Sequence, residues 1–292
     1  MLCIGFSKMG IIIGIDVGGS TTKIVGFKEH GGTYELIEPQ FVKANDPVTA
    51  TYGAFGKFTD ENGIAIQDIS KVCMTGVGAS YVKRDLYGIE CVRVPEFTCI
   101  GHGGLYLSDL SNALVVSMGT GTALVHAHEG KMKYLGGTGV GGGTLMGLSE
   151  LLTGAQSVEH IVEYAEGGDL SMIDLKIKDI TAPDALAGLS RDMTAANFGN
   201  VSDVATKNDI AVGILNMVYE TVGMVSVFAA KHCGVKDIVL TGNLTRIPYC
   251  QRKFEEFNNM GYGVRFVIPT RAQFATVIGC ALSGIEFKLE DN

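Results

Sequence analysis

A strand–turn–strand pattern that occurs twice limits this 292-residue chain to a small number of folds. In Ile11–Phe27 a β-branched run is interrupted by the glycine- and hydroxyl-rich turn Val17–Thr22. Roughly one hundred residues later, Ala113–Ala127 repeats the pattern around the turn Met118–Thr122. Each pattern predicts a β-hairpin, and the recurrence predicts that the chain is internally duplicated.

Strand and helix patterns alternate between and after the two hairpins. A buried strand is predicted at Lys71–Thr75 and a helix at Ser80–Tyr87. Thr153 and Gln156 have the spacing of a capping box, which predicts a helix that begins there. Alternating strands and helices are typical of an α/β fold.

The second half of the chain is more helical. From about Asn208 to His232, apolar residues recur at helical spacing, and Gly234 is placed to end the helix. The reverse face is also apolar, which predicts a helix buried in the interior or at a subunit contact. Length and duplication together predict two lobes, residues 1–105 and 106–292, with a ligand crevice between them.

Charge and cysteine content argue against several classes of protein. The chain has 23 Lys and Arg against 31 Asp and Glu, a formal net charge of −8, which argues against a nucleic-acid partner. Its seven cysteines occur singly, with no C-x-x-C pair, which predicts reduced thiols, a cytoplasmic location and no zinc or iron–sulfur site. No apolar run approaches the ~18 residues of a membrane span. One interpretation of Met1–Lys8 is a dispensable leader before a natural start at Met9.

Four glycine-rich segments have the composition of phosphate-binding loops. Two are the hairpin turns, one precedes an apolar helix at Gly139–Thr144, and one follows a late strand at Gly242–Asn243. Glycine lets backbone N–H groups converge on phosphate oxygens, hydroxyls donate further bonds, and a helix N-terminus adds orphan N–H donors and a positive dipole end. A single turn of this kind is more often a plain hairpin. The candidate phosphate-binding residues are Gly18, Gly19, Ser20, Thr21, Lys23, Gly119, Thr120, Gly121, Thr122, Gly141, Gly142, Gly143, Thr144, Gly242 and Asn243.

Asp16 and Lys23 flank the first turn, and each has two interpretations. Asp16 ends the first strand, where a carboxylate could hold the Mg²⁺ of a nucleoside triphosphate or could form an Asx turn. Lys23 could reach a phosphate or be a solvated strand residue. The chain lacks G-x-x-x-x-G-K-[ST], and no G-x-G-x-x-G follows the first strand in dinucleotide-binding register. A nucleotide site clamped by hairpins is the interpretation that remains.

Three segments resemble the motifs of a nucleotide-binding superfamily. Gly14–Lys23, Ser117–Thr122 and Val239–Asn243 are similar to the first phosphate, second phosphate and adenosine motifs of the actin, sugar-kinase and heat-shock-ATPase superfamily. The resemblance implies a duplicated, two-lobed α/β fold of the actin-like ATPase type, ribonuclease H-like in each half. It also implies that ATP and Mg²⁺ bind in a cleft between the lobes.

Three further segments resemble the type II pantothenate kinases. They are Gly136–Leu148, Ile173–Lys176 and Asp192–Gly199, and the similarity runs in the same order over nearly the whole chain from Ile11 onward. The resemblance implies transfer of the ATP γ-phosphoryl group to the primary hydroxyl of pantothenate, the first step of coenzyme A biosynthesis. It also implies a homodimer.

The same resemblance assigns site residues. The family's catalytic glutamate opens a helix after a strand, which matches Glu96, and Pro95 favours a sharp entry to that helix. A carboxylate at this corner could accept the hydroxyl proton. Without the resemblance, Glu96 is interpreted as an acidic residue favoured by the helix dipole. The implied substrate-binding residues are Tyr134, Thr194, Ala195, Ala196 and Asn197.

Tyr134 departs from the family pattern. Family members usually have an arginine at this place to engage the pantothenate side, and Tyr134 cannot supply a fixed positive charge. Lys133 alternates to the other strand face, and Arg191 is a speculative substitute. A changed acceptor therefore stays open.

Three rival functions stay open. The chain could be a kinase for a sugar or another pantothenate-like alcohol, a nucleotide-driven switch or activator ATPase, or an inactive relative that only senses a ligand. Activators of the reductive dehydratase type would need paired cysteines for a bridging iron–sulfur cluster, and the chain lacks that spacing. His126 and His128 share a strand face, but the sequence offers no third ligand for a metal.

Overall fold

The computed structural model describes residues 10–19, 21–43, 46–182 and 191–290. The described chain forms two compact units. The first unit comprises the described residues of Met1–Val115, Val125–Tyr134 and Pro269–Asn292, and the second those of Val116–Leu124 and Leu135–Ile268. The division predicted from sequence was a single cut after residue 105. The structure differs because the last helix returns to the first unit, which a single cut cannot represent.

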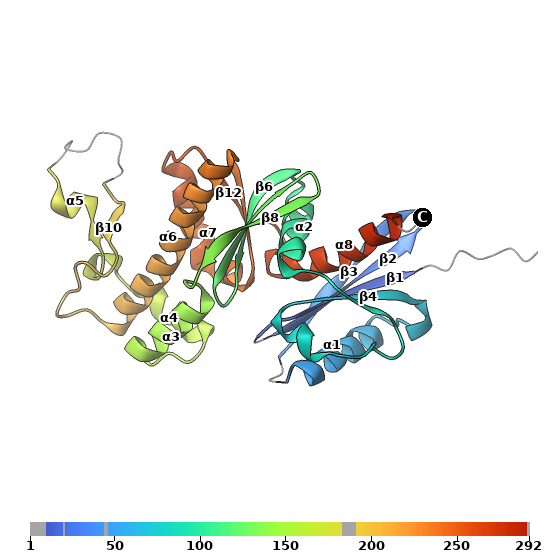
Figure 1. Ribbon diagram of the computed structural model, residues 1–292. Helices are drawn as coiled ribbons and strands as arrows, with labels where there is room; N and C mark the ends of the chain where they lie inside the picture. The colour runs from blue at the N-terminus through green and yellow to red at the C-terminus, as the bar shows by residue number, and fades with distance from the viewer. Residues whose placement is uncertain (1–9, 20, 44–45, 183–190, 291–292) are drawn as a thin grey trace, which may run out of the picture. The chain divides into compact units, whose positions relative to one another are not determined.

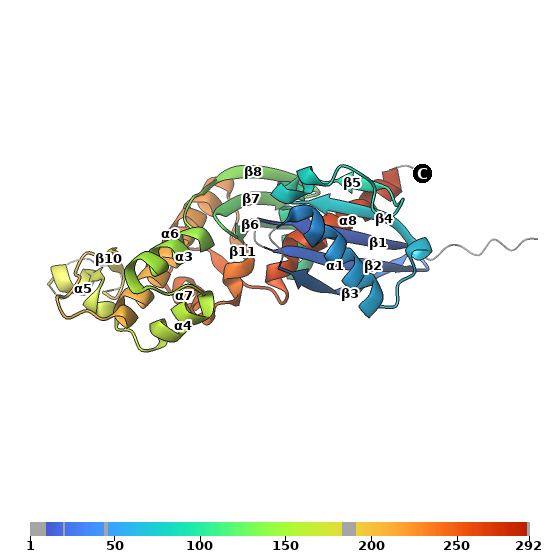
Figure 2. The same cartoon turned by 90° about the horizontal axis from the view of Figure 1, so that it is seen from below.

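The first unit contains a five-stranded sheet of order β3-β2-β1-β4-β5 (Figures 1 and 2). Its strands are β1 (Ile11–Val17), β2 (Thr22–His30), β3 (Thr33–Val42), β4 (Ile69–Thr75) and β5 (Cys91–Arg93). β1 and β2 form the predicted hairpin, with Val17 opposite Thr22. β4 runs parallel to both β1 and β5, and β3 runs antiparallel to β2.

Helices cover both faces of this sheet. They are α1 (Pro47–Glu61), α2 (Glu96–Ser108) and α8 (Ala275–Glu290), with the short 3-10 turns η1 (Ile66–Asp68), η2 (Val77–Tyr81) and η5 (Ala272–Phe274). Ile15 of β1 lies in one apolar cluster with Phe55 of α1, whereas Phe27 of β2 lies in another with Val277 of α8. Figure 2 shows α1 lying across the strands of the sheet. Burying each such side chain stabilises the folded state by about 1.5–3 kcal/mol relative to leaving it exposed.

A second five-stranded sheet has the order β12-β11-β6-β7-β8. Its strands are β6 (Asn112–Met118), β7 (Thr122–His128), β8 (Lys131–Thr138), β11 (Asp237–Thr241) and β12 (Arg265–Val267). Read in the other direction, this order is β8-β7-β6-β11-β12. Three strands that are consecutive in the chain are followed by two that come later, which is the same arrangement as β3-β2-β1-β4-β5 in the first sheet. This repetition confirms the predicted internal duplication and the second hairpin.

The second unit is rich in helices. They are α3 (Gly142–Thr153), α4 (Val158–Glu166), α5 (Ile177–Ile180), α6 (Lys207–Cys233) and α7 (Pro248–Asn259), with the turns η3 (Leu170–Met172) and η4 (Asn243–Arg246). A two-stranded antiparallel sheet, β9 (Leu175–Lys176) and β10 (Thr194–Ala196), completes the unit.

The long helix predicted from sequence is confirmed as α6. Thr206 caps its start and Gly234 ends it in the left-handed conformation, at φ 68°. Among the described residues, α6 is the one helix whose length and apolar composition would suffice to cross a membrane. However, 67% of its apolar window is buried inside the protein, which is also how the core helix of a soluble protein behaves.

One predicted helix and the predicted start of another are wrong. The segment predicted as a helix at Ser80–Tyr87 contains only the end of η2, and Tyr87 then adopts a positive φ of 53° before Gly88. The capping box predicted at Thr153 is absent because Thr153 ends α3 and its hydroxyl donates to the Ser149 carbonyl. Ser157 caps the following helix instead, accepting the His160 N–H.

Candidate active site

Asp16 lies at the end of β1, opposite Lys23 of β2 and Thr75 of β4. Gly76, which follows β4, has a φ of 88°, and a Cβ there would be 2.6 Å from Asp16 Oδ1. Only glycine therefore fits beside this carboxylate. The Gly18 N–H, which an Asx turn would direct to Asp16, donates instead to the Thr21 carbonyl at 3.1 Å.

Burial raises the pKa of Asp16, and the nearby Lys23 ammonium acts in the opposite direction. Lys23 Nζ also donates to the Gln273 carbonyl at 2.6 Å, so this side chain is anchored within the first unit. Neither sequence interpretation of Lys23 anticipated that contact, because Gln273 is far away in the sequence.

The residues around Asp16 fit a magnesium ion held through one carboxylate. Thr75 Oγ1 is buried and has no hydrogen-bond partner among the described residues, and its position opposite Asp16 leaves a polar atom unsatisfied there. Mg²⁺ typically uses one or two carboxylates together with phosphate and water oxygens. In the described part of the chain, no group of three or more His, Cys, Asp or Glu could hold a metal. His126 and His128 instead stack on each other, with ring centroids 4.9 Å apart.

Glu96 is the first residue of α2, and Pro95 before it is extended. The residue reaches the surface, yet surrounding protein desolvates the carboxylate enough to raise the pKa of Glu96. The charge of Asp16 raises it further. Two acidic groups whose charges influence each other therefore lie in the first unit. Of the other residues predicted in this hairpin, Gly18, Gly19 and Thr21 form its turn, and Ser20 lies outside the described residues.

In the second unit, the turn between β6 and β7 is hydrogen-bonded to the glycine-rich loop before α3. The N–H groups of Gly142 and Gly143 donate to the carbonyls of Gly119 and Thr120, both at 2.8 Å. A Cβ at Gly141 would be 2.8 Å from the Gly121 backbone, so the two loops can approach only without side chains. The sequence predicted orphan N–H donors here. The structure differs because carbonyl groups of the hairpin turn already accept hydrogen bonds from two of these N–H groups.

The threonines of these loops are also engaged within the protein. Thr122 Oγ1 donates to the Val140 carbonyl, and Thr144 Oγ1 donates to the Gly139 carbonyl, both at 2.9 Å. These bonds fix the shape of the loop in front of α3. What the loop still offers an anion is the positive end of the α3 dipole.

The predicted adenosine motif meets the same hairpin. Gly242 follows β11 with a φ of 92°, and a side chain there would collide with the Met118 backbone just before the hairpin turn. Thr241 Oγ1 donates to the Val116 carbonyl at 3.2 Å. Asn243 opens η4 and is exposed. The structure therefore brings together three of the four predicted phosphate-compatible loops.

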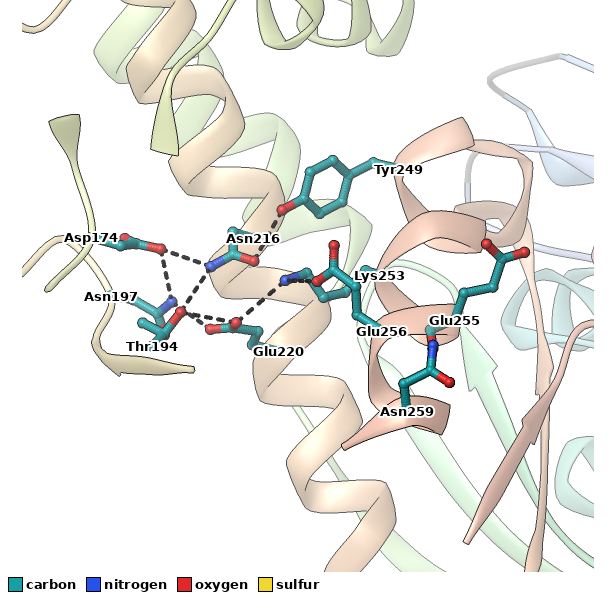
Figure 3. Close-up of polar contacts among 10 residues, drawn as sticks. All are labelled: Asp174, Thr194, Asn197, Asn216, Glu220, Tyr249, Lys253, Glu255, Glu256 and Asn259. Atoms are coloured by element: carbon teal, nitrogen blue, oxygen red, sulfur yellow. Dashed lines mark hydrogen bonds and ion pairs between the residues drawn. The ribbon is translucent and has the colours of Figure 1, made fainter. Parts of the chain in front are cut away.

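The predicted substrate segment Thr194–Asn197 lies on β10 and the turn after it. Thr194 Oγ1 donates to Glu220 of α6 at 2.9 Å, and Asn197 Nδ2 donates to the same carboxylate at 3.0 Å (Figure 3). Their polar side chains are therefore directed into the protein, whereas Ala195 is exposed. Ala196 pairs with Leu175 of β9.

A buried polar network holds this segment against α6 and α7, as Figure 3 shows. Asp174 is fully buried and accepts bonds from the Phe198 N–H at 2.8 Å and from Asn216 Nδ2 at 2.7 Å. Burial raises the pKa of Asp174 despite these donors. Lys253 Nζ lies 3.4 Å from Glu220 Oε1 and brings a positive charge to the network.

Sequence reasoning missed this network. Asp174 lies inside a segment already matched to the family, but nothing local shows that it contacts Phe198. Asn216, Glu220 and Lys253 are polar positions on helices, and their one sequence signal is that Asn216 and Glu220 interrupt the apolar pattern of α6.

Tyr134 is on β8 and half-exposed, and its ring stacks on that of Phe97, the residue after Glu96. The alternatives named for the missing arginine are placed differently. Lys133 is exposed on β8, and the Arg191 carbonyl accepts the Lys178 N–H in the second unit.

Comparison with known proteins gives relatives over almost the full chain. A family model described as Fumble matches residues 107–253. The type II pantothenate kinase of Oceanobacillus iheyensis is 30% identical over 289 residues, covering 93% of this chain and 98% of the relative. That of Staphylococcus aureus strain MRSA252 is 27% identical over 282 residues, covering 93% and 99%.

Solved structures share the fold at low identity. An activator of 2-hydroxyisocaproyl-CoA dehydratase from Clostridium difficile with bound ADPNP has a TM-score of 0.67 at 16% identity, covering 96% of each chain. A ROK family glucokinase from Streptomyces griseus in complex with glucose and AMPPNP has a TM-score of 0.60 at 12% identity, covering 94% and 99%. These confirm the actin-like, two-lobed fold class. The full-length relatives go further: the chain belongs to the type II pantothenate kinase family.

Proposed function

We propose that this chain is an ATP-dependent kinase that phosphorylates the primary hydroxyl of pantothenate, the first step of coenzyme A biosynthesis. The observation that carries the proposal is the 30% identity to a type II pantothenate kinase over 98% of that relative's length. The proposal is supported by the second hairpin, whose turn at 119–121 is hydrogen-bonded to the loop before α3 and whose Met118 backbone lies against Gly242. The position of Glu96 at the start of α2 also supports it.

In the proposed mechanism, Glu96 accepts the proton of the acceptor hydroxyl, whose oxygen then bonds to the γ-phosphorus of ATP. The bond between that phosphorus and the β–γ bridging oxygen breaks, and ADP leaves with the electron pair. The loops of the second unit hold the nucleotide. Asp16 would hold Mg²⁺, which neutralises developing charge on the phosphates when bound.

The raised pKa of Glu96 predicts the pH dependence of catalysis. A general base must be deprotonated, so activity is lost as the pH falls through the pKa of Glu96. Since burial and Asp16 both raise that pKa, we expect the acidic limb of the kcat/KM profile to lie above the ordinary glutamate range. Initial rates in buffers of constant ionic strength measure this. An acidic limb within or below the ordinary range would contradict the assignment of Glu96.

An assay of ATP consumption across acceptors tests the proposed function. We expect ADP release that depends on pantothenate and that hexoses do not support. Phosphorylation of hexoses alone would instead establish the sugar-kinase alternative. A second candidate, a kinase for another pantothenate-like alcohol, is favoured by Tyr134, which lacks the positive charge usual in the family; pantetheine as acceptor tests it.

The assembly and the location of the protein belong to the same proposal. A homodimer is supported by the apolar helix α6, on which Phe228 remains 64% exposed. A cytoplasmic location is supported by cysteines that occur singly in the sequence. ATP consumption without any acceptor, together with capture of a partner protein, would favour the switch ATPase instead.

A further inference from the structure

We propose that Phe97 and Tyr134 form the wall of the acceptor subsite and contact the branched aliphatic carbon next to the reacting hydroxyl. This aromatic pair would then select acceptors that present methyl groups at that carbon over polyols that present hydroxyls. The inference rests on the proposed function and adds to it which part of the acceptor these two side chains recognise.

The geometry of the aromatic pair is unusual for a surface. The two rings are nearly parallel, with an interplanar angle of 9° and centroids 3.9 Å apart. Phe97 is 38% exposed and Tyr134 is 46% exposed, so the pair presents a preformed apolar face to its surroundings. Such a face has little rotamer freedom left to lose, which favours its use in binding.

The spacing of residues along α2 and β8 brings the two rings into contact. Met132 and Tyr134 are two residues apart on β8 and therefore share a face of that strand. Gly101 and Phe97 are four residues apart on α2 and therefore share a face of that helix. The Met132 side chain fills the space where a Cβ at Gly101 would be, which places the next pair, Tyr134 and Phe97, in contact.

The position of the pair relative to the proposed base identifies its occupant. Glu96 and Phe97 are consecutive residues in the first turn of α2. An acceptor whose hydroxyl is within hydrogen-bond distance of Glu96 has its next carbons only one or two bonds away. Because consecutive side chains of a helix diverge by about 100°, the rings flank the carboxylate without sharing its face, and those carbons are the part of the acceptor nearest to them.

The chemistry of this face determines which acceptor it favours. In pantothenate, the carbon beside the primary hydroxymethyl group has two methyl groups, whereas the corresponding carbon has a hydroxyl in an open-chain polyol and the ring oxygen in a hexopyranose. Buried methyl groups gain about 0.8 kcal/mol each. A hydroxyl or a ring oxygen on an apolar face loses hydrogen bonds to water without replacement. The aromatic pair therefore favours the branched alcohol.

The test compares pantothenate with its analogue that lacks the two methyl groups. For the wild-type enzyme we expect kcat/KM to favour pantothenate by about tenfold. In Tyr134→Ala this preference should fall to about twofold or less, mainly through a higher KM for pantothenate. Tyr134→Phe keeps the ring and should keep the preference. Tyr106→Ala removes a half-exposed ring about 14 Å further along α2 than Phe97 and is the matched control.

The outcomes separate the inference from the proposed function. Thermal unfolding of each variant shows that the fold is kept, and Phe97→Ala, which removes the other ring of the pair and should lower the preference in the same way, provides a second variant if Tyr134→Ala does not fold. A wild-type enzyme that phosphorylates pantothenate, but whose preference is unchanged in Tyr134→Ala or lost equally in Tyr106→Ala, would overturn the inference alone. A wild-type enzyme that phosphorylates neither compound would overturn the proposed function and the inference together.

Discussion

Replacing Glu96 by glutamine should lower kcat by about 10²–10⁴-fold, because glutamine keeps the size of the side chain but cannot accept the hydroxyl proton. ATP binding should be retained, since Glu96 is assigned to the acceptor hydroxyl and belongs to none of the four phosphate-compatible loops. Steady-state kinetics with pantothenate and a separate titration with a nonhydrolysable ATP analogue measure the two effects. The structure allows this variant because the Glu96 side chain reaches the surface at the start of α2.

Glu90→Gln is the matched control for this variant. Glu90 is exposed and lies six positions before Glu96, so it tests the loss of a surface carboxylate as such. We expect its turnover to equal that of the wild-type enzyme. Unchanged turnover in Glu96→Gln would refute the role of Glu96 as the base.

Replacing Asp174 by alanine should lower the free energy of unfolding by about 3 kcal/mol. The change removes the acceptor of the part-buried Phe198 N–H and leaves the buried Asn216 Nδ2 only the longer bond to Thr194 Oγ1, at 3.4 Å. Phe198 also has a positive φ of 55°, a conformation that the surrounding bonds must maintain. The turn after Thr194 should therefore lose its fixed position. Urea unfolding of the wild type and the variant measures the difference.

Asp203→Ala is the control for Asp174→Ala, because Asp203 is an exposed acidic residue of the same region. Its free energy of unfolding should stay within about 0.5 kcal/mol of the wild-type value. Equal stability of Asp174→Ala and the wild type would show that the network of Figure 3 does not hold the 194–197 segment in place.

Local patterns were enough to predict the features that depend on neighbouring residues. The two hairpins follow from β-branched runs around glycine turns, and α6 follows from its apolar spacing and Gly234. The close approach of the Gly139–Gly143 loop to another segment could not be predicted, since its partner carbonyls belong to Gly119 and Thr120. Glycine content shows that something approaches closely, but not whether it is a phosphate or another backbone.

The features that the sequence did not predict depend on contacts between residues that are far apart in the chain. Asp174 and Asn216 are separated by 42 positions, and no periodic pattern connects them. The stacking of Phe97 on Tyr134 depends on the packing of β8 against α2, which neither segment reveals alone. The last helix returns to the first unit for a similar reason: Val277 completes a cluster with Phe27 of β2.

The most direct test of the kinase assignment follows the γ-phosphoryl group itself. ATP labelled at the γ-phosphate is incubated with the enzyme, Mg²⁺ and pantothenate, and the products are separated and identified by mass spectrometry. We predict that the label appears on the primary hydroxyl of pantothenate in equal amount to the ADP formed. Label released only as inorganic phosphate, at a rate that pantothenate does not change, would contradict the account.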